Sequence, residues 1–401
     1  MITRRTLGAG AAALGLVAGR RARAQAQPLK IGVLTDMTGA LSAVLGQGSV
    51  EGAKLAIEDF GGSAAGMPVQ LLFADHQNKP DVASNVARKW IDEDGVSLVM
   101  DLGSSAAALA VQNIVRDKNR IAIITGAATS EITGRSCNRN TFHWGYDTYM
   151  QSAAVAAELT RRGGDSWFFL TADYAYGHTL EADARRQIEA NGGRVVGSVR
   201  HPANTHDMSS FLLQAQGSRA KMIGIASAGD DMERAVRQGG EFGLWRQQQA
   251  VAFGMQLYNV PSVGVAAMRG ILHNSIFYWD RTEATRAFSK RLWAILGKPP
   301  AETHAVNYSA AGAYLRAVQA AGTKETEPVL AALRAMKVDD VVTPGGQVRA
   351  DGRLVRPTFL LEVKAPDQVK ETWDVFTVKG EIPGDVAFRS PADSACPLLR
   401  G

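Results

Sequence analysis

The 401-residue sequence predicts an α/β protein in which two doubly wound, parallel-sheet lobes follow one another. Short apolar runs without polar alternation recur along the chain, as expected for strands that are covered on both faces. Stretches with helical periodicity separate these runs, and this alternation favours right-handed βαβ crossovers. The pattern pauses at residues 143–148 and restarts with a helix, which indicates the second lobe.

Eight short apolar runs are predicted as strands, and the amphipathic stretches between them as helices. The runs are residues 30–34, 69–73, 97–100, 121–124, 167–170, 194–199, 222–226 and 251–253. The first helix is marked by an apolar stripe of Val50, Ala53, Ile57 and Phe60. After a mostly helical region at 281–323, the chain closes with short strands between Gly and Pro turns, which predicts antiparallel hairpins.

The formal charge of +5 lies in the first 26 residues, which contain five Arg and no acidic residue. The rest of the chain carries 39 basic and 39 acidic residues, so its charge gives no reason to expect nucleic acid as a partner. A basic start, an apolar stretch at 7–18 and a cleavage site of small residues near 24–26 predict a cleaved export signal. Residues 3–7 resemble a twin-arginine signal, and the general secretory route is the alternative. The apolar stretch is too short to span a membrane, so we expect a periplasmic mature chain without membrane insertion.

The chain has two cysteines, Cys137 and Cys396. In an exported protein, two cysteines predict a disulfide, here one that closes a loop of 259 residues and ties down the end of the chain. Two unpaired thiols are the alternative, although free thiols persist poorly in oxidising compartments.

The sequence offers little support for an enzyme. It has no G-x-S-x-G elbow, no phosphate-binding P-loop, no H-E-x-x-H and no Cys-x-x-Cys, so we expect no catalysis, no metal and no cofactor. Ser104 and Ser105 could act as a nucleophile only if the fold supplied a base, and His143 and His178 are the candidates. An exported α/β hydrolase is therefore kept as an unfavoured alternative.

Polar turns follow the predicted strands, where ligands bind in open α/β sheets. These turns are residues 36–39, 101–105 and 125–130 in the first lobe, and 173–177, 227–231 and 254–258 in the second. The first-lobe turns have hydroxyls and helix-start N–H groups without Arg or Lys, which suits a carboxylate or amide oxygen. Helix capping alone is the alternative for each of these turns. In the second lobe, Tyr174 and Tyr176 are expected to close over a ligand, with core packing as their alternative role, and Asp230 is either a ligand contact or a helix cap.

Several of these segments resemble solute-binding proteins of branched-chain amino acid-type ABC importers, the leucine/isoleucine/valine-binding protein-like family. The segments are residues 30–39, 48–53, 56–60, 124–129, 171–177 and 277–280. The resemblance implies a type I periplasmic binding fold, in which three hinge crossings join the lobes. We expect the crossings near Tyr146, Trp279 and Arg356. The first lobe would then comprise 27–146 and 280–356, and the second lobe 147–279 and 357–401.

The resemblance also implies a binding site between the lobes. Ser104 or Ser105 and the turn of Ala127, Ala128 and Thr129 would hold a ligand carboxylate. The full set of candidate ligand contacts is Ser104, Ser105, Ala127, Ala128, Thr129, Tyr174, Tyr176, Asp230 and Gln256.

One departure from the family pattern bears on the ligand. Gln256 stands where amino-acid binders place an acidic residue on the ligand ammonium, and Asp230 is the alternative counter-charge. A neutral glutamine leaves a buried ammonium unpaired, which is costly. We therefore expect a small carboxylate or amide without an α-ammonium, such as an aromatic or short-chain organic acid, with an amino acid as the alternative.

The implied function is the periplasmic substrate-binding component of an ABC importer. It would capture a small ligand by lobe closure and deliver it, as a monomer, to a membrane permease with its ATPase subunits. A ligand-binding sensory partner of a receptor is the alternative that the sequence leaves open.

Overall fold

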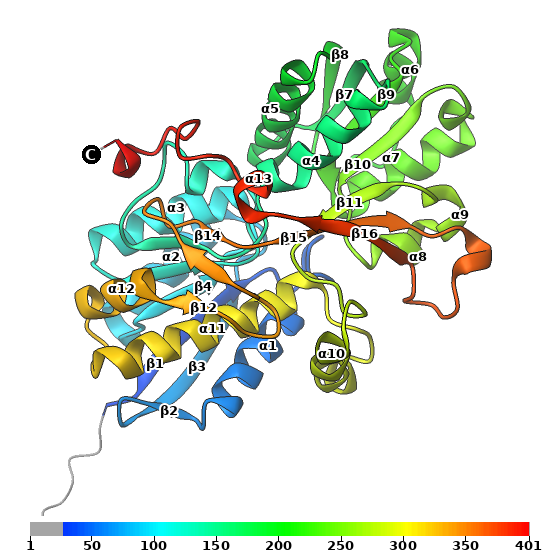
Figure 1. The fold of residues 1–401 in the computed structure, drawn as a ribbon. Helices are drawn as coiled ribbons and strands as arrows, with labels where there is room; N and C mark the ends of the chain where they lie inside the picture. The colour runs from blue at the N-terminus through cyan, green and yellow to red at the C-terminus, as the bar shows by residue number, and fades with distance from the viewer. Residues whose placement is uncertain (1–26, 401) are drawn as a thin grey trace, which may run out of the picture.

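The computed structural model describes residues 27–400 and shows two α/β lobes side by side (Figure 1). The expected export signal, residues 1–26, lies outside the described residues. Among the described residues, no helix is both long and apolar enough to cross a membrane. The predicted α/β fold with parallel sheets is confirmed.

The first lobe is built on a six-stranded sheet with the order β2-β3-β1-β4-β5-β6. Its strands are β1 (Leu29–Thr35), β2 (Ser63–Ala64), β3 (Met67–Asp75), β4 (Leu98–Asp101), β5 (Ile121–Ile124) and β6 (Thr141–His143). All neighbours pair in parallel except β2 and β3, which form a short hairpin. The parallel strands therefore end at one edge of the sheet, where the predicted polar turns follow them.

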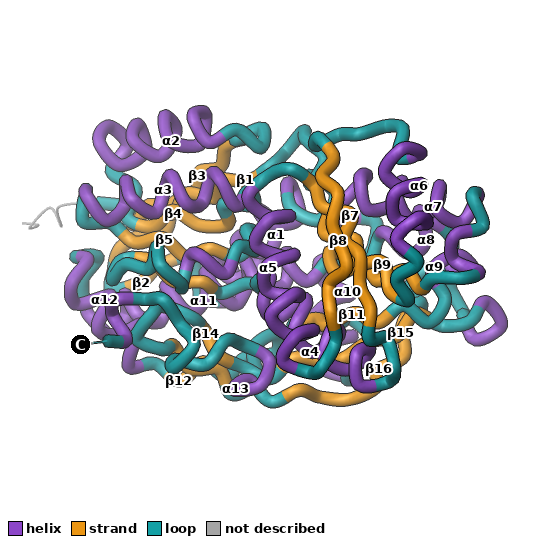
Figure 2. The backbone as a smooth tube through the Cα atoms, turned by 90° about the horizontal axis from the view of Figure 1, so that it is seen from above, coloured by secondary structure: helices purple, strands orange, loops and turns teal. Residues whose placement is uncertain are grey.

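Helices cover both faces of this sheet (Figure 2). The longer helices on this side of the molecule are α1 (Gly46–Asp59), α2 (Pro80–Lys89), α3 (Ser105–Asp117), α11 (Glu302–Ala321), α12 (Thr326–Ala335) and α10 (Glu283–Leu296), which packs on α1. The pair α1 and α11 lies on one face, and α2 and α3 lie on the other. The α1–α11 contact depends on Gly52, because a Cβ there would lie 2.1 Å from the carbonyl oxygen of His304.

The second lobe has a four-stranded parallel sheet with the order β10-β9-β7-β8. Its elements are β7 (Ser166–Ala172), β8 (Arg194–His201), β9 (Met222–Ala228), β10 (Gln249–Gly254), α4 (Thr148–Arg161), α5 (Ala175–Ala190), α6 (Ser209–Ser218) and α7 (Gly229–Glu241). In Figure 2 the strands β7, β8 and β9 lie between α5 on one side and α6 and α7 on the other.

All eight predicted strands form, but two of them are not covered on both faces as expected. Strand β8 alternates between exposed and partly buried residues because it is the edge of its sheet, and Val196 is 45% exposed. Strand β3 has β1 on one side but only the two-residue β2 on the other, and Phe73 is 51% exposed. An apolar run therefore predicted the strand, whereas its coverage depends on its place in the sheet.

The predicted antiparallel tail forms two small sheets. One contains β11 (Leu272–Ser275), β15 (Thr358–Val363) and β16 (Phe376–Ile382), and the other contains β12 (Lys337–Val338), β13 (Gly346–Val348) and β14 (Leu354–Val355). The short helices α8 (Asn259–Val263), α9 (Val265–Met268) and α13 (Gly384–Ala387) complete the α-helices of the described residues. Strand β15 of the tail pairs with β11, which lies much earlier in the chain. The tail therefore packs against an element of the preceding part of the fold.

Three connections join the two lobes, and they run from β6 to α4, from β11 to α10 and from β14 to β15. Tyr146, Trp279 and Arg356 each lie in one of these connections. Two buried arginines, one on each side of β14, hold the first connection. Arg353 is paired with Asp147 at 3.3 Å, and Arg356 donates to the carbonyl oxygen of Trp144 at 3.3 Å.

The predicted disulfide is confirmed, with 5.6 Å between the Cα atoms of Cys137 and Cys396. This bond fastens the last residues of the chain to the first lobe, although 357–401 was expected to belong to the second. Just before it, Arg389 forms an ion pair with Asp183 of α5, and its carbonyl oxygen accepts from Arg349 at 2.8 Å. The end of the chain therefore contacts both lobes.

Candidate functional site

A cavity of about 290 Å³ lies between the lobes, at the carboxyl ends of the parallel strands of both sheets. From the first lobe it is lined by Ala40, Leu41, Ala43, Val44, Asn78, Gly103, Ser104, Ser105, Gly126, Ala128 and Tyr146. From the second lobe it is lined by Gln151, Tyr174, Tyr176, Ala228, Gly229, Asp230, Glu233, Gly254, Gln256, Tyr258, Asn259 and Ser262. This is where open α/β sheets hold small ligands.

Seven of the nine candidate contacts line this cavity, and two do not. The seven are Ser104, Ser105, Ala128, Tyr174, Tyr176, Asp230 and Gln256. Ala127 instead presents its carbonyl oxygen to the His143 ring, with 2.8 Å between Nε2 and O. The Thr129 hydroxyl lies 3.0 Å from that of Thr179 on the second lobe. Only Ala128 of this turn therefore faces the cavity.

The two serines at the start of α3 keep a free donor hydrogen. The Ser104 hydroxyl caps α3 and accepts from the N–H of Ala107 at 3.5 Å. The Ser105 hydroxyl accepts from the N–H of Thr129 at 3.3 Å. Because each hydroxyl oxygen serves as an acceptor in these bonds, its own hydrogen remains available to a ligand oxygen.

Three helices of ten residues or more begin at the cavity wall, namely α3, α5 and α7. The capping residues of α5 and α7 are Tyr174 and Ala228, and neither makes a side-chain cap. The first N–H groups of these helices therefore add partial positive charge to the cavity. No Lys or Arg is among the lining residues, so these N–H groups and the serine hydroxyls are the anion-binding groups of the wall.

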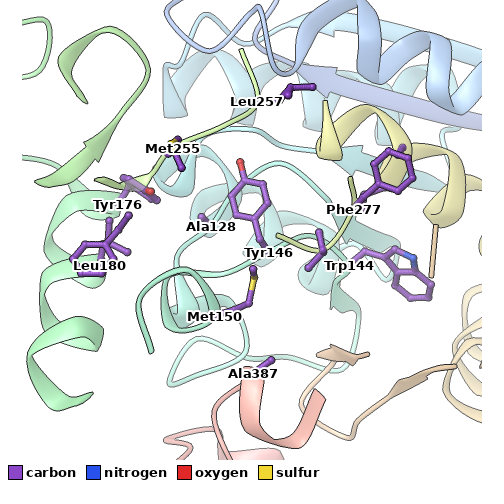
Figure 3. Close-up of a cluster of buried hydrophobic side chains, with 14 of the residues drawn as sticks. Ala128, Trp144, Tyr146, Met150, Tyr176, Leu180, Met255, Leu257, Phe277 and Ala387 are labelled. Carbon is purple, nitrogen blue, oxygen red and sulfur yellow. The ribbon is translucent and has the colours of Figure 1, made fainter. Parts of the chain in front are cut away.

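Four tyrosines supply most of the flat surface of the cavity. Tyr174 and Tyr176 stack with 6.1 Å between ring centroids and 26° between planes. Tyr146 approaches from the first lobe, and in the view of Figure 3 Ala128 lies between the rings of Tyr146 and Tyr176. The fourth, Tyr258, donates to the carbonyl oxygen of Pro299 at 2.6 Å.

These tyrosines are neutral hydrogen-bonding groups. Burial raises the pKa of Tyr146, Tyr174 and Tyr176 above that of a free phenol, so each keeps its proton at neutral pH. The Tyr176 hydroxyl donates to Oε1 of Gln151 at 3.0 Å. Within residues 27–400, the hydroxyls of Tyr146 and Tyr174 make no hydrogen bond, which leaves them for a ligand.

Gln256 is held by a buried carboxylate beneath the cavity. Its Nε2 donates to Oε1 of Glu302 at 2.9 Å. The other oxygen of Glu302 accepts from the Ser275 hydroxyl at 2.6 Å and from the Ile276 N–H at 3.1 Å. Burial raises the pKa of Glu302, while these donors and the charge of Arg356 oppose that shift.

Both acidic residues of the wall already have partners. The Asp230 carboxylate is paired with Arg234 at 3.1 Å, and its side chain is 60% exposed. Glu233 accepts from Nδ2 of Asn259 at 2.7 Å and from the hydroxyl of Ser262. Glu233 was missed from the sequence, although it follows Asp230 by three residues and therefore shares its helix face.

Other lining residues were also missed for identifiable reasons. Tyr146 was assigned to the hinge alone, yet the same connection brings its ring to the cavity. Gln151 begins the helix that was predicted after the pause at 143–148, and the sequence did not distinguish the side of this helix that faces the cavity. Tyr258 closes a turn that was already singled out for Gln256, and the alternation of side chains after β10 could have indicated it.

Neither candidate base reaches the serines. His143 is fully buried, and burial lowers its pKa well below the ordinary range. His178 lies 2.7 Å from Asp173 through Nε2. Among residues 27–400, neither ring is hydrogen-bonded to Ser104 or Ser105, so neither histidine is placed to activate these serines. That part of the chain also contains no group of three His, Cys, Asp or Glu side chains placed to hold a metal.

Known proteins resemble the chain over almost its full length. Residues 28–368 match the family described as periplasmic binding protein. A periplasmic binding protein of Burkholderia mallei has 39% identity and a TM-score of 0.91, covering 93% of this chain and 99% of its own. A branched-chain amino acid ABC transporter periplasmic ligand-binding protein of Burkholderia xenovorans has 42% identity and a TM-score of 0.83, with coverages of 92% and 100%. A Leu/Ile/Val-binding protein homolog of Brucella abortus is 25% identical over 338 residues, which is 79% of this chain and 83% of the relative.

Proposed function

The chain belongs to the periplasmic binding protein family, and on this premise we propose that it captures a small carboxylate without an α-ammonium group, such as an aromatic acid. The protein is the solute-binding component of an ABC importer. It is exported through residues 1–26, acts as a monomer, and delivers its ligand to a permease with ATPase subunits.

The observation that carries this proposal is the chemistry of the cavity wall. Ser104, Ser105 and the starts of α3, α5 and α7 offer hydrogen-bond donors without a full positive charge, which suits a carboxylate. Tyr146, Tyr174 and Tyr176 offer aromatic surface for a planar body.

The cavity wall has fewer groups that suit an ammonium. Gln256 is neutral, and its amide N–H₂ group is directed at Glu302. Asp230 is paired with Arg234, and Glu233 is engaged by Asn259. Among the lining residues, Glu233 is the only carboxylate that forms no ion pair, so an ammonium in this cavity would have to use Glu233, which already accepts from Asn259 and Ser262.

An amino acid is the second candidate, because the Glu233 carboxylate does line the cavity. Proteins with this fold include binders of both ligand classes. A leucine-binding protein of Thermotoga maritima shares it at 20% identity and a TM-score of 0.78. A Rhodopseudomonas palustris solute-binding protein in complex with benzoate shares it at 18% identity and a TM-score of 0.81. The side chains of the wall, not the fold, must therefore select the ligand.

Calorimetric titration separates the two candidates. Purified protein is titrated with benzoate-type acids, short amides and leucine, and the same series is repeated with Glu233→Gln. We expect a benzoate-type acid to bind in both proteins and leucine to bind in neither. Tight leucine binding that is lost in Glu233→Gln would replace the first candidate with the second.

We also infer that the bound ligand is released unchanged, since neither His143 nor His178 is hydrogen-bonded to Ser104 or Ser105. Mass spectrometry of ligand recovered after long incubation, with a matching ester and amide as further probes, should return only the starting compounds. Release of an alcohol or amine from either probe would instead favour the hydrolase alternative.

A further inference from the structure

We propose that Glu302 sets the ligand specificity of the cleft by holding the Gln256 side-chain amide with its carbonyl oxygen toward the cavity. The ligand would then carry a hydrogen-bond donor, a hydroxyl or an amide N–H, at the end opposite its carboxylate. This inference rests on the proposed function and adds a second polar group to the ligand.

The orientation of Gln256 follows from what surrounds Glu302. Glu302 begins α11 and is only 4% exposed. One carboxylate oxygen accepts from the Ile276 N–H at 3.1 Å, and a backbone N–H can act only as a donor. The other oxygen lies 2.9 Å from Nε2 of Gln256. Glu302 is taken as ionised, the form that its three hydrogen-bond donors and the charge of Arg356 favour. Turning the Gln256 amide over would then place two oxygen acceptors against each other, so only one orientation is satisfied.

This orientation leaves one atom of Gln256 for the ligand. Oε1 accepts no hydrogen bond from residues 27–400, and Gln256 lines the cavity. The backbone around it is fixed, because the Gln256 N–H donates to Oδ1 of Asn259 at 2.7 Å. A buried carbonyl oxygen favours a ligand donor and rejects a ligand oxygen that lacks a hydrogen.

The serine hydroxyls of the first lobe therefore differ in polarity from Gln256 of the second lobe. The serines present donors, and Gln256 presents an acceptor. A ligand that satisfies both has a carboxylate for the serines and a separate donor for Gln256, as a hydroxyl-substituted aromatic acid does.

Glu302→Gln provides the test, because it should reverse the Gln256 amide. The Ile276 N–H still needs an acceptor, so the carbonyl oxygen of the new side chain stays there and its NH₂ group faces Gln256. Gln256 must then accept with Oε1 and turn its own NH₂ toward the cavity. The ligand end would now meet a donor instead of an acceptor.

The readout is the ratio of affinities for matched hydroxy- and methoxybenzoates, substituted at position 3 or 4, measured by calorimetry. We expect wild-type protein to prefer the hydroxy member of at least one pair by tenfold or more, and Glu302→Gln to reduce this preference below threefold or invert it. Glu325→Gln removes an exposed carboxylate at the start of α12, and it should keep the wild-type ratio.

Each other outcome has a defined meaning. A tenfold preference that persists in folded Glu302→Gln, or equal binding of every pair by wild-type protein, overturns the role of Glu302 but leaves the carboxylate proposal standing. If wild-type protein binds none of the acids, both proposals fall. If Glu302→Gln does not fold, Gln256→Leu must abolish the hydroxy preference, and retention of the preference overturns the inference.

Discussion

The end of β10 is packed so closely that Gly254→Ala should damage the site. A Cβ at Gly254 would lie 2.3 Å from the carbonyl oxygen of Ser227 and 2.7 Å from the hydroxyl oxygen of Tyr176. Ordinary van der Waals contact begins at 3.4 Å, so the end of β10 must move away from β9 by about 1 Å. The obstacle is the backbone of a neighbouring strand, which cannot rotate aside as a side chain can.

The expected loss follows from this displacement. Overpacking of this kind costs about 1–3 kcal/mol. Gln256 lies two residues beyond Gly254, and Tyr176 contacts the added methyl group directly, so both would shift with the strand. If the ligand must restore the original geometry, this strain reduces affinity by roughly 10- to 100-fold.

Gly217→Ala is the matched control. Gly217 lies in α6, and a Cβ there meets no atom within 4 Å. This change should leave affinity unchanged and stabilise the helix by up to about 1 kcal/mol. Calorimetry with the tightest-binding acid measures affinity, and urea unfolding measures stability. Binding by Gly254→Ala within twofold of wild type would refute the argument that β10 positions the site.

Three further changes test other parts of the structure. Tyr176→Ala should weaken ligand binding more than tenfold by calorimetry, because it removes a ring that stacks on Tyr174, and unchanged affinity would remove Tyr176 from the site. His273→Phe should reduce the pH dependence of the unfolding free energy: burial lowers the pKa of His273 from 6.5 to about 4, so the unfolded chain binds the proton first. Wild-type stability should therefore lose up to about 3 kcal/mol more than the variant as pH drops through that window, and an equal loss in the two proteins would contradict this. Cys396→Ser opens a 259-residue loop and should lower the free energy of unfolding in urea by about 2–5 kcal/mol. A loss below about 0.5 kcal/mol would show that the disulfide contributes little to stability.

The sequence predicted the two sheets because their strands are strongly apolar. Runs such as 121–124 and 167–170 can only be buried, and both form strands with every residue buried. Strands β2, β6 and β11 were not predicted, because short segments that are not uniformly apolar, such as Thr141–His143, carry no clear pattern of their own. Their pairing depends on neighbouring strands that are distant in sequence.

The candidate site was predictable where its residues follow strands directly. Ser104, Ser105 and Gln256 line the cavity because the carboxyl ends of parallel strands meet at one edge. The turn after β5 shows the limit of this reasoning, because only Ala128 of its three candidates faces the cavity. Glu302 could not be found in this way, since it begins a helix of the first lobe and reaches Gln256 only through the assembled fold.

A crystal structure of the protein with its tightest-binding acid tests the central claim most directly. The account predicts the carboxylate between the lobes, within hydrogen-bond distance of the hydroxyl of Ser104 or Ser105, and the ligand body against Tyr146 and Tyr176. A ligand outside this cavity, or one bound through an ammonium to Glu233, would contradict it.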